Sequence, residues 1–298
     1  MRSRSDGQAL TREYLDALRH QRRLSAATLS NYSRALDVLL ELKGKKELES
    51  LEAAEVRRYV AVLHSKGLSP RSLALALSAW RGYFRWLARH RGFQSNPVLG
   101  IRAPKAARPL PKALSVESAQ RLLDGANETT PLAMQDAAMF ELLYSSGLRV
   151  GELVALDLSD DPAQGEVTVT GKGSKTRTVP VGEKARDALK AWLEIRSQVA
   201  APEEKALFVG ARGRRITPSR VWHRLTAWAK RRGLAEHVHP HMLRHSFASH
   251  MLQSSQDLRA VQELLGHASI STTQVYTHLD FQALAKVYDA AHPRARKK

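Results

Sequence analysis

The sequence predicts a mainly α protein with an N-terminal helical bundle at residues 1–95 and an α-rich C-terminal domain at 113–298 that contains a small antiparallel β-sheet. Four observations support this prediction. Apolar residues recur at helical spacing before residue 95, and a basic, proline-rich segment at 96–112 separates the two parts. Only one pair of neighbouring segments, 165–170 and 176–181, alternates with the period of β-strands. A chain of 298 residues is long enough for two domains that each bury a core.

The N-terminal part is predicted to be a compact four-helix bundle with basic faces. Ser25 is a suitable N-cap for the second helix, and the third covers about 52–65. Ser69 and Pro70 place a cap before a proline at the first helical position, so a fourth helix begins there and runs to about His90. The apolar stripe of this helix is Leu73, Leu77, Trp80, Phe84 and Leu87.

The segment SNPVLGIRAPKAARPLPK, residues 95–112, holds four prolines and four basic residues. Proline lacks the N–H group that a helix interior needs, so this stretch cannot be one continuous helix. It is predicted to be an interdomain linker, which either follows DNA as a basic strap or is a solvated tether.

The first half of the C-terminal domain is predicted to contain two helices and a hairpin. One helix runs from Pro131 to Ser145 and is stopped by Gly147, and a short helix follows from about Arg149. The two alternating segments flank the turn GKGSK as a β-hairpin, and ALFVG at 206–210 is a candidate third strand.

The second half is predicted to be helical. Thr217 and Pro218 open a basic helix, and a further helix from about Asp257 ends at Gly266. Ser271 and Gln274 have capping-box spacing, which places Tyr276 on the helix that they open. In the C-terminal tail, Phe281, Leu284, Val287 and Tyr288 have helical spacing.

The charge balance predicts a polyanionic partner. The chain holds 47 Lys and Arg against 29 Asp and Glu, a net charge of +18. Residues 1–110 carry 21 basic and 9 acidic residues, and 111–298 carry 26 and 20. Nucleic acid is the expected partner, and the N-terminal part is expected to grip it more than to react with it. The alternative is a basic surface that serves solubility alone.

Other classes are disfavoured by composition. There is no cysteine, so disulfides and thiolate ligands are absent. No apolar run approaches the length that spans a bilayer, and the first residues lack the apolar core of a signal peptide. We expect a cytoplasmic protein that does not enter a membrane.

The segment HPHMLRHSFASH, residues 239–250, raises the question of a metal site. His241 and His245 are four apart and could present both imidazoles to a cation. However, Met242 stands where a zinc-protease motif has glutamate, and Arg244 lies between the histidines and would repel a cation. We therefore expect no metal.

An anion site suits the same segment better. His241 and Arg244 are three apart on one helix face, and Pro240 suits a first turn whose unpaired N–H groups attract negative charge. Arg149 and His267 each follow a glycine that stops a helix, where sites are often built. Packing or surface positions are expected for His239, His245 and His250.

Three strings carry a family resemblance. SSGLRVGELVAL at 145–156, HMLRHSFASHML at 241–252 and LLGHASISTTQVYTHL at 264–279 occur in this order, and GKGSKTRTVPV at 171–181 adds a hairpin lysine. In motif and spacing the chain resembles the tyrosine recombinases, the integrase-type site-specific recombinases, over essentially its whole length. The resemblance implies a SAM-like, core-binding N-terminal domain and a tyrosine-recombinase catalytic domain. The segment 257–295 looks most like the bacterial chromosome-resolution recombinases of the Xer group.

The resemblance also implies a mechanism. Tyr276 would attack a DNA phosphodiester, form a 3′-phosphotyrosyl link and release a 5′-hydroxyl. Arg149 and Arg244 would carry the charge of the transition state, and His267 would donate a further hydrogen bond. His241 would assist proton transfer near the nucleophile. The remaining catalytic residue, which would protonate the departing 5′ oxygen, is Lys172.

Fixed cations would take the place of a metal in this chemistry, so neither a metal nor a nucleotide cofactor is expected. Glu152 follows Arg149 within its motif and is expected to support structure. The cations expected to contact the DNA backbone are Arg71, Arg81, Arg85, Lys175, Arg177, Arg214, Arg215 and Arg220.

The implied partners are double-stranded DNA with a dif-like site, a XerD-like partner recombinase and a DNA translocase of the FtsK type. The C-terminal tail would dock on a neighbouring protomer in a cyclic heterotetramer on two duplexes, and the alternative is packing on its own domain. The implied role is resolution of chromosome or plasmid dimers during segregation and cell division. Alternatives are a mobile-element or phage integrase with the same chemistry, a DNA-binding regulator without chemistry, and a metal-dependent hydrolase built on the histidines.

Overall fold

The computed structural model describes residues 2–22, 24, 26–105, 113–124, 130–171, 176–266 and 278–295. The chain divides into two compact units, Met1–Arg108 and Pro109–Lys298, each with its own buried core. Within the described ranges, no helix has both the length and the apolar character that a membrane span requires.

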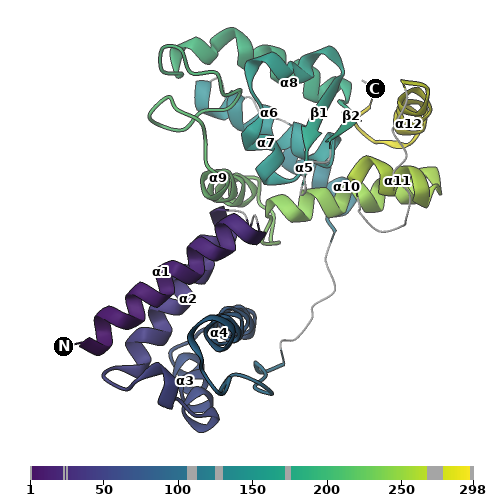
Figure 1. Ribbon diagram of the computed structural model, residues 1–298. Helices are drawn as coiled ribbons and strands as arrows, with labels where there is room; N and C mark the ends of the chain where they lie inside the picture. The colour runs from purple at the N-terminus through teal and green to yellow at the C-terminus, as the bar shows by residue number, and fades with distance from the viewer. Residues whose placement is uncertain are drawn as a thin grey trace. The chain divides into compact units, whose positions relative to one another are not determined.

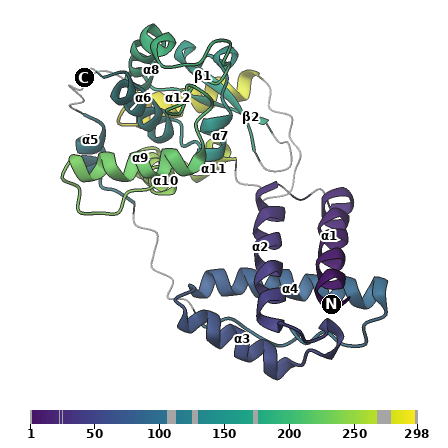
Figure 2. The same cartoon turned by 90° about the vertical axis from the view of Figure 1, so that its left-hand side faces the viewer.

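The N-terminal unit is a helical bundle, as predicted. Its elements are α1 (Arg2–Arg22), α2 (Ala26–Lys43), the 3₁₀ helix η1 (Leu48–Ser50), α3 (Ala53–Ser65) and α4 (Pro70–Arg91). Figure 2 shows α1 and α2 side by side, with α4 running across them. The Trp80 indole is fully buried and donates to the Ala35 carbonyl at 2.7 Å, which ties α4 to α2.

The start of α4 follows the predicted local chemistry. The Ser69 hydroxyl accepts from the Ser72 backbone N–H at 3.1 Å, and Pro70 occupies the first helical turn. The whole predicted stripe of this helix is buried in the core. Ser25, the predicted cap of α2, lies outside the described residues.

The predicted linker is described only as far as Lys105, and its first part packs on the N-terminal unit. Val98 and Ile101 are buried in that unit's core. The Arg81 guanidinium donates to the Ile101 carbonyl at 2.9 Å, and the Asn96 amide donates to the Arg81 carbonyl at 3.1 Å. These contacts anchor the chain after α4, so this part is neither a free tether nor a free strap.

The C-terminal unit surrounds α6 with other helices (Figure 1). α6 packs against α5, α7, α8, α9 and α10, so most of its side chains are buried, including the polar ones of Gln135, Asp136 and Glu141. The helices of the unit are α5 (Val116–Leu123), α6 (Pro131–Ser145), α7 (Val150–Ala155), η2 (Leu158–Asp160), η3 (Pro162–Gln164), α8 (Glu183–Ile195), η4 (Arg196–Gln198), α9 (Pro218–Arg231), α10 (Pro240–Ser255), α11 (Leu258–Leu265) and α12 (His278–Ala291).

The predicted hairpin is present, whereas the candidate third strand is not. β1 (Glu166–Thr170) pairs antiparallel with β2 (Thr176–Pro180), with Val169 opposite Arg177. Segment 206–210 makes only single bridges, Ala206 to Asp157 and Val209 to Arg215. Its bridge partners lie in irregular segments, so no continuous ladder forms there and the described sheet has two strands.

The C-terminal tail packs on its own unit in this single chain. Tyr288 is buried and stacks on His292, with ring centroids 5.0 Å apart, and Leu284 and Val287 pack around the same cluster. This is the alternative to docking on a neighbouring protomer. The side chain of Phe281 is not among those that the structure describes.

A buried ion pair fixes the end of this tail. The Arg294 guanidinium is bidentate on the Glu141 carboxylate of α6, with Nε to Oε2 at 2.7 Å, and Nη1 also donates to Asp124 at 2.9 Å. Burial disfavours the charge on Arg294, but the two carboxylates outweigh burial and raise its pKa. Ala295 accepts from the Glu183 backbone N–H at 3.1 Å, so the tail is held at α6 and α8.

We predict that Arg294→Met lowers the free energy of unfolding by ~3–5 kcal/mol, because Glu141 would lose its bidentate partner inside the protein. Urea unfolding followed by circular dichroism measures this change. Arg259→Met is the control, since Arg259 pairs with Glu263 at 79% side-chain exposure and should cost under about 1 kcal/mol. An equal loss of unfolding free energy in the two variants would show that the buried pair of Arg294 and Glu141 stabilises the protein no more than an exposed pair does.

Candidate functional site

Glu152 on α7 is the centre of a cluster of charged residues. Its side chain is only 4% exposed. The helix begins after Arg149, whose backbone N–H donates to Glu152 Oε2 at 2.8 Å, while its guanidinium Nη1 donates to Oε1 at 2.8 Å. Acidic residues in a first helical turn are stabilised by the free N–H groups and the helix dipole. The hydrogen bonds at the start of α7 therefore position Arg149, the first predicted catalytic arginine.

Arg177 on β2 makes a second set of bonds to the same carboxylate. Its Nη1 and Nη2 donate to the two oxygens of Glu152, each at 2.8 Å, and its Nε donates to the Leu264 carbonyl at 2.9 Å. The side chain is only 10% exposed. The guanidinium of Arg177 is thus held inside the cluster, and its expected contact with the DNA backbone stays a prediction.

Arg244 on α10 completes the cluster. Its guanidinium donates to the Gly147 carbonyl through Nη1 and to the Leu265 carbonyl through Nη2, and Nη1 lies 4.0 Å from Glu152 Oε2. Arg149 and Arg244, which are far apart in the sequence, are thereby brought to the same carboxylate.

The electrostatics of the cluster favour a bound anion. Burial opposes the charge on Glu152, but hydrogen bonds from Arg177 and Arg149 outweigh it and lower the pKa of Glu152 to about 2. Burial, together with the charges of Arg149 and Arg177, lowers the pKa of Arg244 to about 10, so it remains protonated at neutral pH. Among the described residues, three guanidiniums face one carboxylate, and the excess positive charge suits a phosphate.

The start of α10 places His241 in an exposed first turn. Pro240 begins the helix as predicted, and the His239 ring accepts from the Met242 backbone N–H at 3.2 Å. His239 is therefore the N-cap, a role that the sequence did not reveal because histidine is not among the usual capping residues. Of the remaining histidines in this segment, His245 is exposed.

His250 is buried between two partners. Its Nδ1 lies 2.8 Å from the Tyr144 hydroxyl and its Nε2 lies 2.9 Å from the Leu114 carbonyl. The packing and surface positions expected for these histidines agree with the structure. In the parts of the chain that the structure describes, no group of three or more histidines and carboxylates is arranged to hold a metal ion.

Three predicted catalytic residues, Lys172, His267 and Tyr276, lie outside the described residues, and so does Lys175. The predicted capping box at Ser271 and Gln274 also lies outside them. The elements that precede them are described. β1 ends at Thr170, and α11 ends at Leu265, followed by its C-cap Gly266 with a left-handed φ of +63°.

The other expected DNA-contacting cations fall into two groups. Arg215 donates to the carbonyls of Val154 and Leu156 and pairs with Asp157, so its partners are within the protein, as are those of Arg81 and Arg177. The guanidinium of Arg215 therefore stabilises the segment after α7, and its contact with the DNA backbone stays a prediction. The exposed members are Arg71, Arg85, Arg214, Arg215 and Arg220, so Arg215 belongs to both groups.

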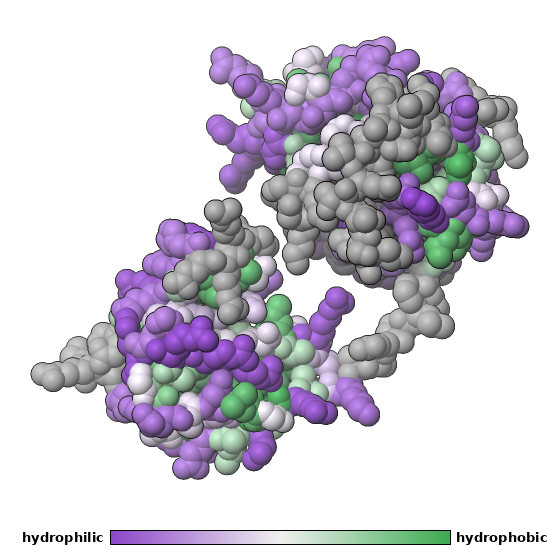
Figure 3. Space-filling model, turned by 45° about the vertical axis from the view of Figure 1, so that its right-hand side comes forward, coloured by the Kyte–Doolittle hydropathy of each residue, from purple (hydrophilic) through white to green (hydrophobic). Residues whose placement is uncertain are grey.

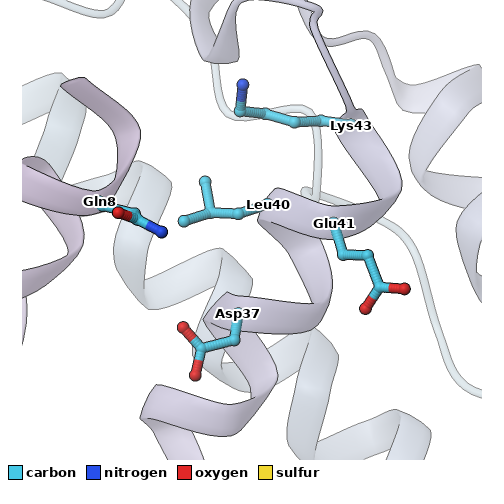
Figure 4. Close-up of a pocket in the computed structure, with 5 residues that line it drawn as sticks. All are labelled: Gln8, Asp37, Leu40, Glu41 and Lys43. Atoms are coloured by element: carbon cyan, nitrogen blue, oxygen red, sulfur yellow. The ribbon is translucent and has the colours of Figure 1, made fainter. Parts of the chain in front are cut away.

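The described surface outside the cluster carries hydrophilic side chains and a pocket that does not suit a phosphate. Figure 3 shows hydrophilic side chains over much of the visible face of each unit, with smaller separate apolar patches. A pocket in the N-terminal unit is lined by Gln8, Asp37, Leu40, Glu41 and Lys43 (Figure 4). The Lys43 ammonium donates to the Lys46 carbonyl at 2.7 Å, and the two carboxylates do not suit a phosphate.

Comparison with protein families places the chain. Residues 112–283 match the phage integrase family, and residues 11–91 match the phage integrase N-terminal SAM-like domain. The chain belongs to the phage integrase family of tyrosine recombinases, enzymes that cleave and rejoin DNA strands.

Individual relatives are similar over nearly their whole length. Tyrosine recombinase XerC 1 of Ralstonia nicotianae is 54% identical over 96% of this chain and 93% of its own length. Tyrosine recombinase XerC of Azotobacter vinelandii is 54% identical over 96% of each chain, and that of Pseudomonas aeruginosa is 53% identical over 96% and 95%.

Solved structures agree with the fold. A lambda integrase fragment bound as a dimer to a COC′ core site has a TM-score of 0.69 at 19% identity and covers 90% of this chain and 98% of its own. XerH site-specific recombinase bound to palindromic difH substrate, in a post-cleavage complex, has a TM-score of 0.67 at 23% identity over 94% and 84%.

We predict that Gly147→Ala lowers both stability and activity, because Gly147 has a φ of +57° and an added Cβ would lie 2.5 Å from the Phe247 ring. The expected cost is ~2–4 kcal/mol, combining backbone strain and overpacking. Displacing α10 would also move Arg244 away from the Gly147 carbonyl.

Gly233→Ala is the matched control, since Gly233 has a φ of +69° but no atom near an added Cβ. It should show only the backbone cost of ~1–2 kcal/mol and full DNA cleavage. Thermal unfolding and a DNA cleavage assay measure both effects. Indistinguishable behaviour of the two variants would mean that the contact with Phe247 does not position Arg244.

Proposed function

We propose that this protein exchanges DNA strands at a specific site through a covalent 3′-phosphotyrosyl intermediate on Tyr276. The observation that carries the proposal is the convergence of Arg149 and Arg244 on one buried carboxylate with positive charge in excess. Such fixed donors suit a phosphodiester whose non-bridging oxygens gain negative charge during attack. Arginine also matches two phosphate oxygens through its forked N–H groups.

The catalytic roles follow the chemistry of transesterification. The Tyr276 hydroxyl loses its proton as its oxygen attacks phosphorus, and the bond from phosphorus to the 5′ oxygen breaks. Arg149, Arg244 and His267 stabilise the charge on the non-bridging oxygens, and Lys172 gives a proton to the departing 5′ oxygen. His241, at the exposed start of α10, assists proton transfer near the nucleophile.

Rejoining needs no external energy source. One phosphoester replaces another, so the bond energy is kept in the protein–DNA link until a second 5′-hydroxyl attacks phosphorus and releases Tyr276. We infer that neither a metal nor a nucleotide takes part, since the guanidiniums supply the positive charge.

The DNA target and partners are proposed from the relatives. Whole-length similarity to proteins named XerC supports action at a dif-like site, in resolution of chromosome or plasmid dimers. This role would use a XerD-like partner in a cyclic heterotetramer, with the C-terminal tails docked between protomers, and a translocase of the FtsK type. Such work places the protein in the cytoplasm. A mobile-element integrase would use the same chemistry at a different site.

A division of labour between the units is part of the proposal. The N-terminal domain at 1–95 would grip DNA through exposed cations such as Arg71 and Arg85. The linker at 96–112 would join it to the catalytic domain at 113–298, where Arg214 and Arg220 would add backbone contacts. These contacts would give strong salt dependence.

The covalent intermediate is directly testable. Incubation with a nicked suicide duplex that carries the host dif site, in EDTA, should give a protein–DNA adduct on a denaturing gel. Tyr276→Phe should give none, because it lacks the hydroxyl. A metal-dependent hydrolase would lose activity in EDTA, and a regulator would give no adduct. An adduct with Tyr276→Phe would refute the assigned nucleophile.

The role of Arg244 is tested by Arg244→Lys. An ammonium cannot hold the Gly147 and Leu265 carbonyls and also fork across a phosphate, so we expect cleavage to fall about 10²–10³-fold. DNA affinity should stay within about threefold, because a positive charge remains. Single-turnover adduct formation and a binding titration separate the two quantities. A matching loss of affinity and cleavage would make Arg244 a binding residue only.

A further inference from the structure

We propose that Arg177 is a positioning residue for strand cleavage, which keeps Glu152 from capturing the catalytic arginine Arg244. This inference rests on the proposed function. Arg177 does not need to touch DNA in this role. It acts by donating to both oxygens of the buried Glu152 carboxylate. Arg244 then keeps its hydrogen bonds to the Gly147 and Leu265 carbonyls and remains available to a phosphate.

The contacts of Arg177 join three elements. Its side chain leaves β2, its Nη1 and Nη2 donate to Glu152 on α7, and its Nε donates to the Leu264 carbonyl near the end of α11. A bidentate pair fixes orientation as well as distance. Because the side chain is nearly buried, solvent screens these contacts little.

The end of α11 also packs on the stem of Arg177. Gly266 has a φ of +63°, and a Cβ there would lie 2.9 Å from Arg177 Cδ. Arg177 and Arg244 hold successive carbonyls, those of Leu264 and Leu265. The two arginines therefore fix together the turn that leads into His267.

The competition arises from the position of Glu152. With Arg177 removed, this buried carboxylate would keep only its hydrogen bonds from Arg149. An underpaired buried charge is costly, and Arg244 Nη1 is already within 4.0 Å. Arg244 would shift onto Glu152 and leave its acceptors at Gly147 and Leu265, so positive charge available to the phosphate would fall.

This mechanism predicts rescue of the cleavage rate of folded enzyme, which a loss of stability alone does not predict. Removing the charge of Glu152 should remove the competitor and return Arg244 toward its original place. Arg177→Met is therefore expected to cleave more slowly than the double variant Arg177→Met, Glu152→Gln. A purely structural role for Arg177 would change the fraction of folded enzyme, so the rates are compared under conditions in which circular dichroism shows both variants to be folded.

The experiment measures single-turnover adduct formation on the nicked suicide duplex at saturating enzyme, together with DNA affinity. We expect Arg177→Met to slow adduct formation about 10²-fold, as small displacements in an active site do, with affinity within about threefold. The double variant should form adduct about tenfold faster than Arg177→Met. Such non-additive effects are typical of residues in one hydrogen-bond network. Arg259→Met, on the exposed side of α11, should match the wild-type protein.

Several results would overturn the inference. These are wild-type cleavage by Arg177→Met, equal losses of affinity and rate, or a double variant no faster than Arg177→Met. If Arg177→Met does not fold, Arg177→Lys tests the inference instead. Lysine keeps the positive charge but cannot donate to both Glu152 oxygens as a guanidinium does. This variant should slow adduct formation about tenfold, and adding Glu152→Gln should restore the rate. If the wild-type protein forms no adduct, the proposed function fails instead.

Discussion

The buried carboxylate of Glu152 is the constraint on which the catalytic unit depends. Its charge is stable in the interior only because guanidiniums from three different elements surround it: Arg149 at α7, Arg177 on β2 and Arg244 on α10. The arginines in turn satisfy the carbonyls of Gly147, Leu264 and Leu265. A shift of any one element would leave a buried charge or carbonyl without its partner. The network therefore fixes the geometry of the cations that a phosphate would meet.

A second buried ion pair secures the C-terminal tail of the same unit. Arg294 reaches Glu141 on α6 from the C-terminal tail, and burial of His292 lowers the pKa of its ring to about 3, so it packs as a neutral aromatic. The tail is thus held by specific contacts rather than by apolar packing alone. Exchange of this tail between protomers, as proposed for the tetramer, would require the partner to supply an equivalent carboxylate for Arg294.

Local chemistry explains which features the sequence could predict. The caps at Ser69, Thr217 and Asp257 and the left-handed stops at Gly147 and Gly266 depend on neighbouring residues, and the structure contains them all. The tertiary partners of Arg177 and Arg215 lie far along the chain, so the sequence showed only that both are basic. Glu152 was expected to support structure, yet its central position became evident only when β2 and α10 were placed around it.

Charge neutralisation at the scissile phosphate is the central claim, and a methylphosphonate at that position tests it most directly. The methyl group removes the negative charge of one non-bridging oxygen, so a missing arginine should matter less. We expect Arg244→Ala to form far more adduct on the methylphosphonate duplex than on the ordinary phosphate duplex, while Tyr276→Phe forms none on either. Equal inactivity of Arg244→Ala on both substrates would contradict the account, because Arg244 would then serve a purpose other than balancing phosphate charge.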